Sequence, residues 1–451
     1  MTQTRRKGPP RSRRKSSTVS ILAAQVAFTP TRPGANGGSD NNVFMAVFSK
    51  TGPMIKIPDS EYLARIDRLR ALMAAKDLGA VYISSPTNLR YFAGLRYLPT
   101  ERPAATVVPR SGEVTFFGPI IEKDHLTYQT RIITKAYHYP DYPGEIHPMK
   151  RFASWLGELG LTGMKIGVDN PSFYSSPWGY KGPKLSDLVH DTGFLPVGDD
   201  LEEMRLIKSK NELACIRETV RWGHTAHELL QKYLAPGVYD FEAATKASLE
   251  ASTLMKKELG PEFKGTTTNP LTANAGIRGQ VGANSAYPHS VSIERPVKRG
   301  DVIGTGASAD IEGYHSELER NLFMGKPDDR VRKYHRIALE MQQAAFEALR
   351  PGAKCSDADR ASSMVAKDNG VAGYLRHHTG HGMGLEGHEP PFLDVGDDTI
   401  IRPNMVLSCE PGIYVPALGG FRHSDTIIIS EDSAEWVNKY PRDTDSLIIE
   451  C

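Results

Sequence analysis

The sequence predicts two structured domains: an α/β domain up to about residue 200, and an α+β domain in which helices pack on a mostly antiparallel sheet. A chain of 451 residues is too long for one ordinary core. In the first half, short apolar strand-like segments alternate with helical patterns, whereas from Leu201 the helical segments become long and the strands scattered. This change of pattern places the domain boundary near Asp199 and Asp200.

The first domain is predicted to open with a helix. Pro58-Asp59-Ser60 offers a helix cap, and apolar residues at helical spacing follow it until Gly79. Residues 110–112 carry the turn signals of a hairpin between two apolar segments. The predicted strands are 80–83, 105–108, 114–117 and 165–168, and a further helix is predicted over 149–158.

The second domain is predicted to contain two long helices. Residues 203–234 favour a helix and contain no glycine before Gly223, and a second helical pattern covers 329–349 and ends before Pro351 and Gly352. Strand-like segments separate and follow these helices. They are residues 302–303, 406–409 and 426–429.

The first 54 residues are predicted to be a disordered tail, or an over-extended start with Met45 as the true beginning. Arg, Ser, Pro and Gly are frequent there, and no acidic residue precedes Asp40. The apolar stretch 19–28 is short and leads to no convincing cleavage site, so a targeting role is the alternative. We therefore expect a tail over 1–54 and domains over 55–200 and 201–451.

Composition indicates a globular protein of a reducing compartment, and we expect it in the cytoplasm. The net charge is +2, and the basic residues outside the tail form no patch with aromatics, which argues against nucleic acid as a partner. No run of about 18 apolar residues exists, which excludes a spanning helix. The cysteines are far apart and form neither a Cys-x-x-Cys pair nor a disulfide framework. They are Cys215, Cys355, Cys409 and Cys451.

Histidines in the second half mark candidate sites. His289 lies in a polar loop before a turn and a strand, a position where a lone histidine is most often a surface residue. His381 stands between glycines, and His388 follows seven residues later. Four glycines from Gly380 to Gly387 disfavour a helix, so we predict an extended segment that presents both imidazoles towards a cleft.

Carboxylates accompany these histidines. Glu317 and Glu319 precede an apolar segment, and Glu410 ends another, immediately before a Pro-Gly turn. A buried carboxylate needs a metal, an imidazole or a cationic substrate as its partner. Arg422, shortly before the final strand, is most simply a structural partner for a nearby carboxylate.

These motifs together resemble the pita-bread superfamily of creatinase, prolidase, aminopeptidase P and methionine aminopeptidase. The resemblance covers roughly residues 60–440, including the linker 204–209. It implies a curved sheet covered by helices in the second domain, hydrolysis of a C–N bond there, and a homodimer or higher oligomer. The motifs are Pro288-His289, Gly313-Tyr314, Gly380-His381-Gly382, His388-Glu389, Glu410-Pro411-Gly412 and Gly419-Gly420-Phe421-Arg422.

The metal-dependent branch of this superfamily holds two Mn²⁺, Co²⁺, Zn²⁺ or Fe²⁺ ions with two Asp, one His and two Glu. By position, the first Asp corresponds to Gly306, the second to Glu317 and the final Glu to Ser424, while His381 and Glu410 match. Two ligands are thus absent and one is altered, which a two-metal centre does not tolerate without new ligands. Any metal would be held by Glu317, His381, Glu410 and Asp425.

The metal-free member, creatinase, fits these departures better. By this resemblance His289 is the general acid/base, with His381 orienting or polarising the substrate and His388 beside it as a further catalytic residue. Glu319 and Glu410 would bind a cationic or amide-bearing group. In creatinase the glutamate at the position of Glu319 contacts a guanidinium, and the sequence context here is similar; a structural ion pair is the alternative role for Glu319.

Two further substrate contacts are implied by the same resemblance. Arg102, in Glu101-Arg102-Pro103, corresponds to an arginine that reaches the substrate carboxylate in the neighbouring subunit. His315 corresponds to a substrate-binding tyrosine. Creatinase has a substrate-binding histidine where Ser424 stands here, so creatine is not the expected substrate. Residues 388–393 instead look like aminopeptidase P, so a peptide or a proline-like ring also suits the pocket.

Three hypotheses follow. The first is a metal-independent hydrolase of a C–N bond in a small zwitterion, which needs only an acid/base pair with suitable pKa values. The second is a metal-dependent Xaa-Pro aminopeptidase or dipeptidase with substituted ligands, and the third a catalytically silent binding protein. The first implies no cofactor and the second a divalent Mn, Fe, Co or Zn ion. All three imply a small molecule or short peptide as partner, and no membrane.

Overall fold

The computed structural model describes residues 55–451 except 176–181, 261–262, 264, 266–269 and 292–294. The predictions for the tail 1–54 and for Met45 lie outside the described residues. No helix in the described part of the chain is long and apolar enough to span a membrane. The boundary near residue 200 stays a prediction.

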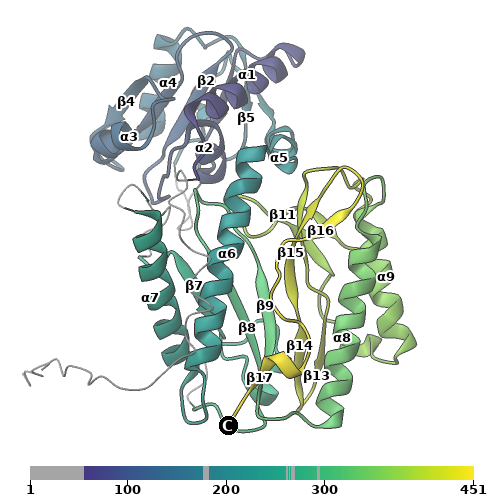
Figure 1. Ribbon diagram of the computed structural model, residues 1–451. Coiled ribbons are helices and arrows are strands. Elements are labelled where there is room, and N and C mark those ends of the chain that lie inside the picture. Colours follow the sequence, from purple (N-terminus) through teal and green to yellow (C-terminus); the bar gives the residue numbers. More distant parts are fainter. Residues whose placement is uncertain (1–54, 176–181, 261–262, 264, 266–269, 292–294) are drawn as a thin grey trace, which may run out of the picture. The chain divides into compact units, whose positions relative to one another are not determined.

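The first half forms an α/β unit around a six-stranded mixed sheet of order β4-β3-β2-β1-β5-β6 (Figure 1). The predicted hairpin is confirmed, because β2 and β3 pair antiparallel. The strands are β1 Ala80–Ile83, β2 Ala105–Pro109, β3 Thr115–Pro119, β4 Lys135–Tyr139, β5 Lys165–Val168 and β6 Gly193–Pro196. The helices are α1 Asp59–Ala75, α2 Pro86–Ala93, α3 Lys123–Gln129, α4 Pro148–Glu158 and α5 Gly198–Leu206, with 3-10 turns η1 Ile120–Glu122 and η2 Leu185–Asp187.

The second half forms a nine-stranded, mostly antiparallel sheet with helices against it, as predicted. Its main path runs β11-β10-β12-β15-β9-β8-β7, with β16 beside β15 and β17 beside β9, and β13 and β14 form a separate ribbon. The strands are β7 Ala273–Gly276, β8 Val302–Ala309, β9 Leu318–Met324, β10 Gly380–Gly382, β11 Glu389–Leu393, β12 Val406–Cys409, β13 Gly412–Val415, β14 Gly419–Arg422, β15 Ser424–Ile429, β16 Ala434–Trp436 and β17 Ile448–Ile449.

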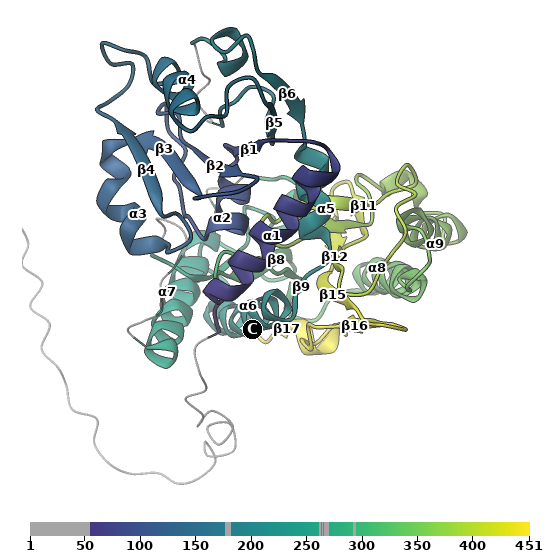
Figure 2. The same cartoon turned by 90° about the horizontal axis from the view of Figure 1, so that it is seen from above.

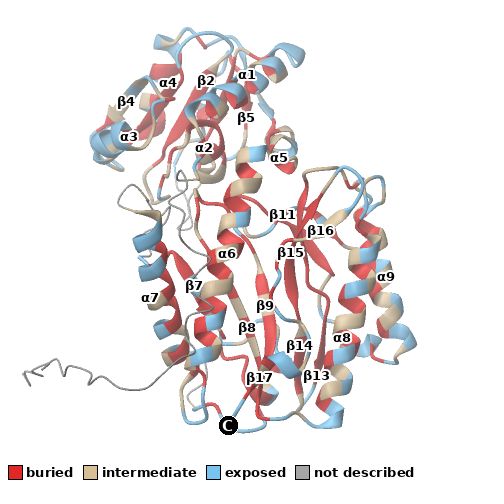
Figure 3. Cartoon of the chain, viewed as in Figure 1, coloured by how far each residue is buried: buried red, intermediate tan, exposed pale blue. Residues whose placement is uncertain are grey.

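Two helix pairs cover this sheet. Helices α6 and α7 pack together against β7 and β8, and α8 and α9 pack together near β12 and β14 (Figures 1 and 2). Buried residues concentrate in the strands and on the inner faces of these helices (Figure 3). The helices are α6 Lys210–Tyr233, α7 Asp240–Leu259, α8 Asp329–Ala348 and α9 Cys355–Asp368, with 3-10 turns η3 Gly282–Ala286, η4 Ala372–Tyr374 and η5 Asp445–Leu447.

The prediction of one helix over residues 203–234 was wrong. The chain forms α5 and α6 with a break at 207–209, because Ser209 caps α6: its hydroxyl accepts from the backbone N–H of Glu212, and the Glu212 carboxylate accepts from the backbone N–H of Ser209. A capping box begins a new helix where helix propensity alone permits a continuous one.

Candidate active site

Neighbouring strands bring three of the predicted residues together. His381 is the middle residue of β10, and its backbone N–H donates to Oγ of Ser408 on β12 at 3.0 Å. Glu410 directly follows β12. Glu317 directly precedes β9, and its backbone N–H donates to Oγ1 of Thr426 on β15 at 2.9 Å. Because β10, β12, β15 and β9 are adjacent, residues far apart in sequence share one cluster.

His381 lies between the two carboxylates. Its Nε2 is 3.0 Å from Oε1 of Glu410 and 3.6 Å from Oε1 of Glu317. Nδ1 of His381 donates to the carbonyl of Gly382 at 2.9 Å, which leaves Nε2 as the nitrogen that faces the cluster. Nε2 is buried, yet it is not aimed well enough at any oxygen of the described residues for a hydrogen bond. The contact between His381 and Glu410 is therefore an ion pair.

The three groups differ sharply in protonation. Burial, and then the negative charge of Glu410, raise the pKa of Glu317 to about 8. Burial alone would lower the pKa of His381, but the contact with Glu410 and the charge of Glu317 raise it to about 9. Burial alone would raise the pKa of Glu410, but the contact with His381 and the charge of Arg422 lower it to about 2. These directions favour a protonated Glu317, a protonated His381 and an ionised Glu410.

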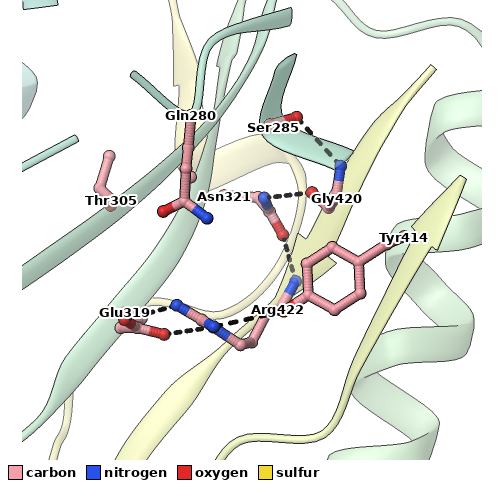
Figure 4. Close-up of a pocket in the computed structure, with 9 residues that line it drawn as sticks. Gln280, Ser285, Thr305, Glu319, Asn321, Tyr414, Gly420 and Arg422 are labelled. Carbon is pink, nitrogen blue, oxygen red and sulfur yellow. Dashed lines mark hydrogen bonds and ion pairs between the residues drawn. The ribbon is translucent and has the colours of Figure 1, made fainter. Parts of the chain in front are cut away.

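Glu319 forms a close ion pair with Arg422. Nε and Nη2 of Arg422 lie 2.5 and 2.7 Å from the two carboxylate oxygens of Glu319 (Figure 4). Nε of Arg422 is also 4.0 Å from Oε2 of Glu410. The predicted structural role of Arg422 is confirmed. For Glu319, the geometry supports the ion-pair role over direct contact with a cationic substrate, because its charge is already paired.

Glu319→Gln is expected to lower the free energy of unfolding by about 3 kcal/mol, because it leaves the mostly buried guanidinium of Arg422 without its charged partner. Urea unfolding of the variant and the wild type measures the loss. Glu113→Gln, at an exposed position, is the matched control and is expected to cost nothing measurable. A Glu319→Gln variant as stable as this control would contradict the ion-pair role.

Ser424 and Gly306 occupy the two positions where the resemblance requires carboxylate ligands. Oγ of Ser424 donates to Oε2 of Glu317 at 2.7 Å. Gly306 on β8 pairs with Glu319 on β9, and a Cβ at position 306 would lie 3.6 Å from the Glu319 side chain. The side chain nearest to Gly306 is thus Glu319, which is paired with Arg422, so in the described part of the chain no free ligand replaces the missing aspartate there.

His388 lies over His381. The ring centroids are 3.7 Å apart and the planes 20° apart, a face-to-face stack. His388 is exposed, and burial of its stacked face and the positive charge of His381 lower its pKa. His289 is also exposed and is near enough for its charge to lower the pKa of His388 further. The structure thus brings the three predicted catalytic histidines to one region.

A small polar cavity of about 10 Å³ adjoins the Glu319–Arg422 pair, which is room for about one water molecule (Figure 4). Two residues near it escaped the sequence analysis. The hydroxyl of Tyr414 accepts from Nη1 of Arg422 at 3.3 Å and lies 2.8 Å from Nε2 of His377. The Pro-Gly turn after Glu410 could have predicted the position of Tyr414, because it returns the chain, as β13, beside the cluster.

Three predicted residues lie elsewhere. Asp425 is fully buried on β15, with its carboxylate bonded to Nη2 of Arg320 at 2.8 Å and to Nε2 of Gln342 at 2.9 Å. Successive residues of a strand point to opposite faces, so Asp425 faces away from Ser424 and cannot be the substitute metal ligand. Arg102 pairs with Glu101 and Asp141 of the first domain. His315 lies in the segment before β9, with its side chain exposed and its backbone N–H bonded to the carbonyl of Gly384 at 2.8 Å.

Comparisons with known proteins place this chain in a family. Two family models match in succession, the Creatinase/Prolidase N-terminal domain over residues 65–207 and Metallopeptidase family M24 over residues 214–431. The chain belongs to the pita-bread M24 superfamily. This confirms the resemblance and the fold class, and the M24 protein is accordingly a hydrolase.

Relatives of this M24 protein match over their whole length. The Xaa-Pro dipeptidase of Pyrococcus furiosus is 28% identical over 84% of this chain and 99% of its own. A probable dipeptidase PepE of Mycobacterium bovis is 28% identical over 85% of this chain and 96% of its own. The crystal structure of a dipeptidase from Pyrococcus horikoshii is 27% identical, with a TM-score of 0.70 over 86% of this chain and all of the other.

A divalent metal is what a metallopeptidase family implies, so the comparisons do not support the predicted metal independence. The donor set decides how far this chain fits. Glu317, His381 and His388 have ligand atoms within 4.8 Å of one another. However, an ion lies near the plane of each imidazole that ligates it, and the planes of stacked rings do not converge, so His388 would have to turn. Among the residues that the structure describes, this donor set suits one ion at most and does not suit two.

Proposed function

We propose that this M24 protein hydrolyses a C–N bond of a small zwitterionic substrate by acid/base chemistry, without a two-metal centre. The observation that carries the proposal is the state of positions 306 and 424. Gly306 offers no ligand, and the hydroxyl of Ser424 is bonded to Glu317. Nearby carboxylates do not compensate, because Glu319 is paired with Arg422 and Asp425 with Arg320.

Charge balance supports the proposal. The carboxylates of Glu319 and Glu410 face two cations, Arg422 and protonated His381. Glu317, with its pKa raised to about 8, is neutral at pH 7. Each of these two carboxylates thus has a cationic side chain as its partner.

The different pKa values suggest the role of each group. His388, exposed and neutral, accepts a proton from water, and the water oxygen bonds to the carbonyl or amidine carbon of the substrate. Protonated His381, whose Nε2 lies between Glu317 and Glu410, stabilises the negative charge that develops on the attacked group. The C–N bond then breaks as Glu317 gives its proton to the leaving nitrogen. Proton transfer from His388 to Glu317 restores both groups.

Both zwitterion ends find complementary charge near the cluster. Glu410 is the carboxylate for a cationic group, which would share its charge with His381. Arg278 offers a guanidinium for a carboxylate: its side chain is 59% exposed, with Nη2 3.7 Å from Oε1 of Glu319. A Xaa-Pro dipeptide is itself a zwitterion, so the names of the relatives and the predicted substrate class agree at this level.

A metal-dependent Xaa-Pro peptidase is the second candidate. The cluster of Glu317, His381 and His388 favours it, as do the relatives named Xaa-Pro dipeptidase. Oxygen and nitrogen donors of this kind suit Mn, Fe, Co or Zn. A bound ion would supply Lewis-acid chemistry and an activated water. His381 would then have to lose the proton that it carries in the cluster.

Elemental analysis of protein purified without added metal separates the two candidates. We expect less than stoichiometric divalent metal, and turnover of small cyclic or guanidino zwitterions that chelation leaves unchanged. Near-stoichiometric metal with chelator-sensitive cleavage of Xaa-Pro dipeptides would instead establish the second candidate. Neither turnover nor metal would indicate a binding protein. Activity before and after chelation is compared on the same preparation.

The double variant Gly306→Asp/Ser424→Glu is expected to gain metal binding, because it restores the two missing carboxylates. Gly306 does not adopt a positive φ, and a Cβ added to it would meet its nearest atoms, those of Glu319, at 3.6 Å, an ordinary contact distance, so the backbone there accepts a side chain. Isothermal titration with Mn²⁺ measures the ions bound per chain. A double variant that binds no more Mn²⁺ than the wild type would show that these two positions do not control the metal content.

A further inference from the structure

The residue after His388 is a buried charge. Glu389 begins β11, and its side chain is only 3% exposed. Its Oε1 accepts from Nζ of Lys208 at 3.0 Å, and Lys208 itself is 1% exposed. Arg205 lies on the other side, with Nε 3.5 Å from Oε2 of Glu389. A buried carboxylate between two cations fixes the backbone beside it, because leaving either charge unpaired is costly.

This ion pair packs directly against residues 383–388, the loop that carries His388. A Cβ at Gly384 would lie 2.3 Å from Oε1 of Glu389 and 3.1 Å from Cε of Lys208. A larger residue there would have to displace this ion pair, so the loop packs closely against the Lys208–Glu389 pair. The loop is also held elsewhere, since the N–H of Met383 donates to the carbonyl of Val406 and the carbonyl of Gly384 accepts from the N–H of His315. The Lys208–Glu389 pair lies at the end of the loop that is next to His388.

Both cations are anchored outside the loop. The backbone N–H of Lys208 donates to the carbonyl of Asn404 at 3.0 Å. Nη1 of Arg205 donates to Oδ1 of Asn88, whose Nδ2 donates to Asp169 at 3.1 Å. The segment between α5 and α6, where the predicted single helix breaks, therefore carries Lys208 to a position under the His388 loop.

We infer that Lys208 is a positioning residue for His388. Through Glu389 it holds the imidazole of His388 stacked on His381, the arrangement from which His388 acts as base. The inference rests on the proposed function for its catalytic consequence, but its structural part does not. Lys208 touches neither water nor substrate in this scheme, because it is buried beneath the loop.

Hydrogen–deuterium exchange tests the structural part. In Lys208→Met, amides of residues 383–389 are expected to exchange about tenfold faster than in the wild type, while those of α8 are unchanged. Glu389→Gln keeps the size of the side chain and is expected to show a smaller increase in the same segment. Lys76→Met, which removes the more exposed pair of Lys76 with Asp200, is the matched control and should leave the segment unchanged.

Equal exchange at 383–389 in Lys208→Met and Lys76→Met would overturn the inference, as would loosening spread evenly over the molecule. Steady-state kinetics on a zwitterion that the wild type hydrolyses tests the catalytic part of the inference. Lys208→Met is expected to lower kcat about tenfold or more with little change in KM. If the loop loosens but His388→Ala retains full activity, the proposed role of His388 fails and the positioning of its loop stands. A lowered kcat with unchanged KM in both variants supports the two together.

Discussion

Glu317→Gln is expected to lower kcat by about 10² to 10⁴-fold, the range typical of loss of a general acid or base. The amide has the size of the carboxyl and can accept from Oγ of Ser424, but it has no proton to give to the leaving nitrogen. KM is expected to change little, since no charge is lost from a group that is neutral at pH 7. Steady-state kinetics on a turned-over zwitterion measures both constants.

Two variants sharpen this test. Glu317→Asp keeps the acidic proton but withdraws it by one methylene, so its kcat should fall less than that of Glu317→Gln. Ser424→Ala removes the hydrogen bond that favours the ionised form of Glu317, so the pKa of this carboxyl should rise further. The alkaline limb of the pH profile should then move to higher pH. Full activity of Glu317→Gln would refute the proton-donor role.

Variants of the two exposed histidines show which of them is the general base. Both His289→Ala and His388→Ala should keep the fold, because each imidazole is exposed. We expect the larger loss of kcat in His388→Ala, since that ring lies against His381. The creatinase resemblance predicts the larger loss in His289→Ala. Near-normal activity of His388→Ala would return the acid/base role to His289.

Acid is expected to destabilise this protein steeply below pH 6.5, because two buried neutral histidines, His335 and His423, resist protonation in the folded state. Nε2 of His335 lies 2.9 Å from Nε2 of His423, and both rings are buried. Burial, followed by the positive charge of Arg320, lowers the pKa of His335 to about 4. Burial, followed by the positive charge of His335, lowers that of His423 well below its usual value.

The sign follows from proton uptake. Between the unfolded pKa near 6.5 and the folded value, the unfolded chain binds more protons, so the free energy of unfolding falls as the pH falls. For His335 alone the full loss is about 3 kcal/mol by pH 4. Urea unfolding at pH 7.5, 6 and 5 measures it. His335→Gln should flatten this pH dependence, whereas His190→Gln, at an exposed position, should not. Equal slopes in both variants would contradict the prediction.

Local chemistry made much of the fold predictable. The helix that begins after Pro58, the apolar strand 80–83 and the helix beginning at Asp329 each depend on a few adjacent residues, and the structure confirms all three. The predicted cap at residues 58–60 forms no side-chain hydrogen bond. The break between α5 and α6 was missed because it depends on one capping box within a segment of uniformly good helix formers. Propensity describes what a segment tolerates, and the cap decides where a helix starts.

The sequence by itself determined the family, the two-domain class, and that Glu317, His381 and Glu410 stand where metal ligands would, because these follow from residue type and spacing. Only the tertiary structure decided which charged side chains form ion pairs with one another. Arg422 pairs with Glu319, Arg320 with Asp425, and Lys208 with Glu389. The physical reason is that a side chain's partner is set by strand register and by the face on which it points, and both depend on pairing between segments far apart in the chain.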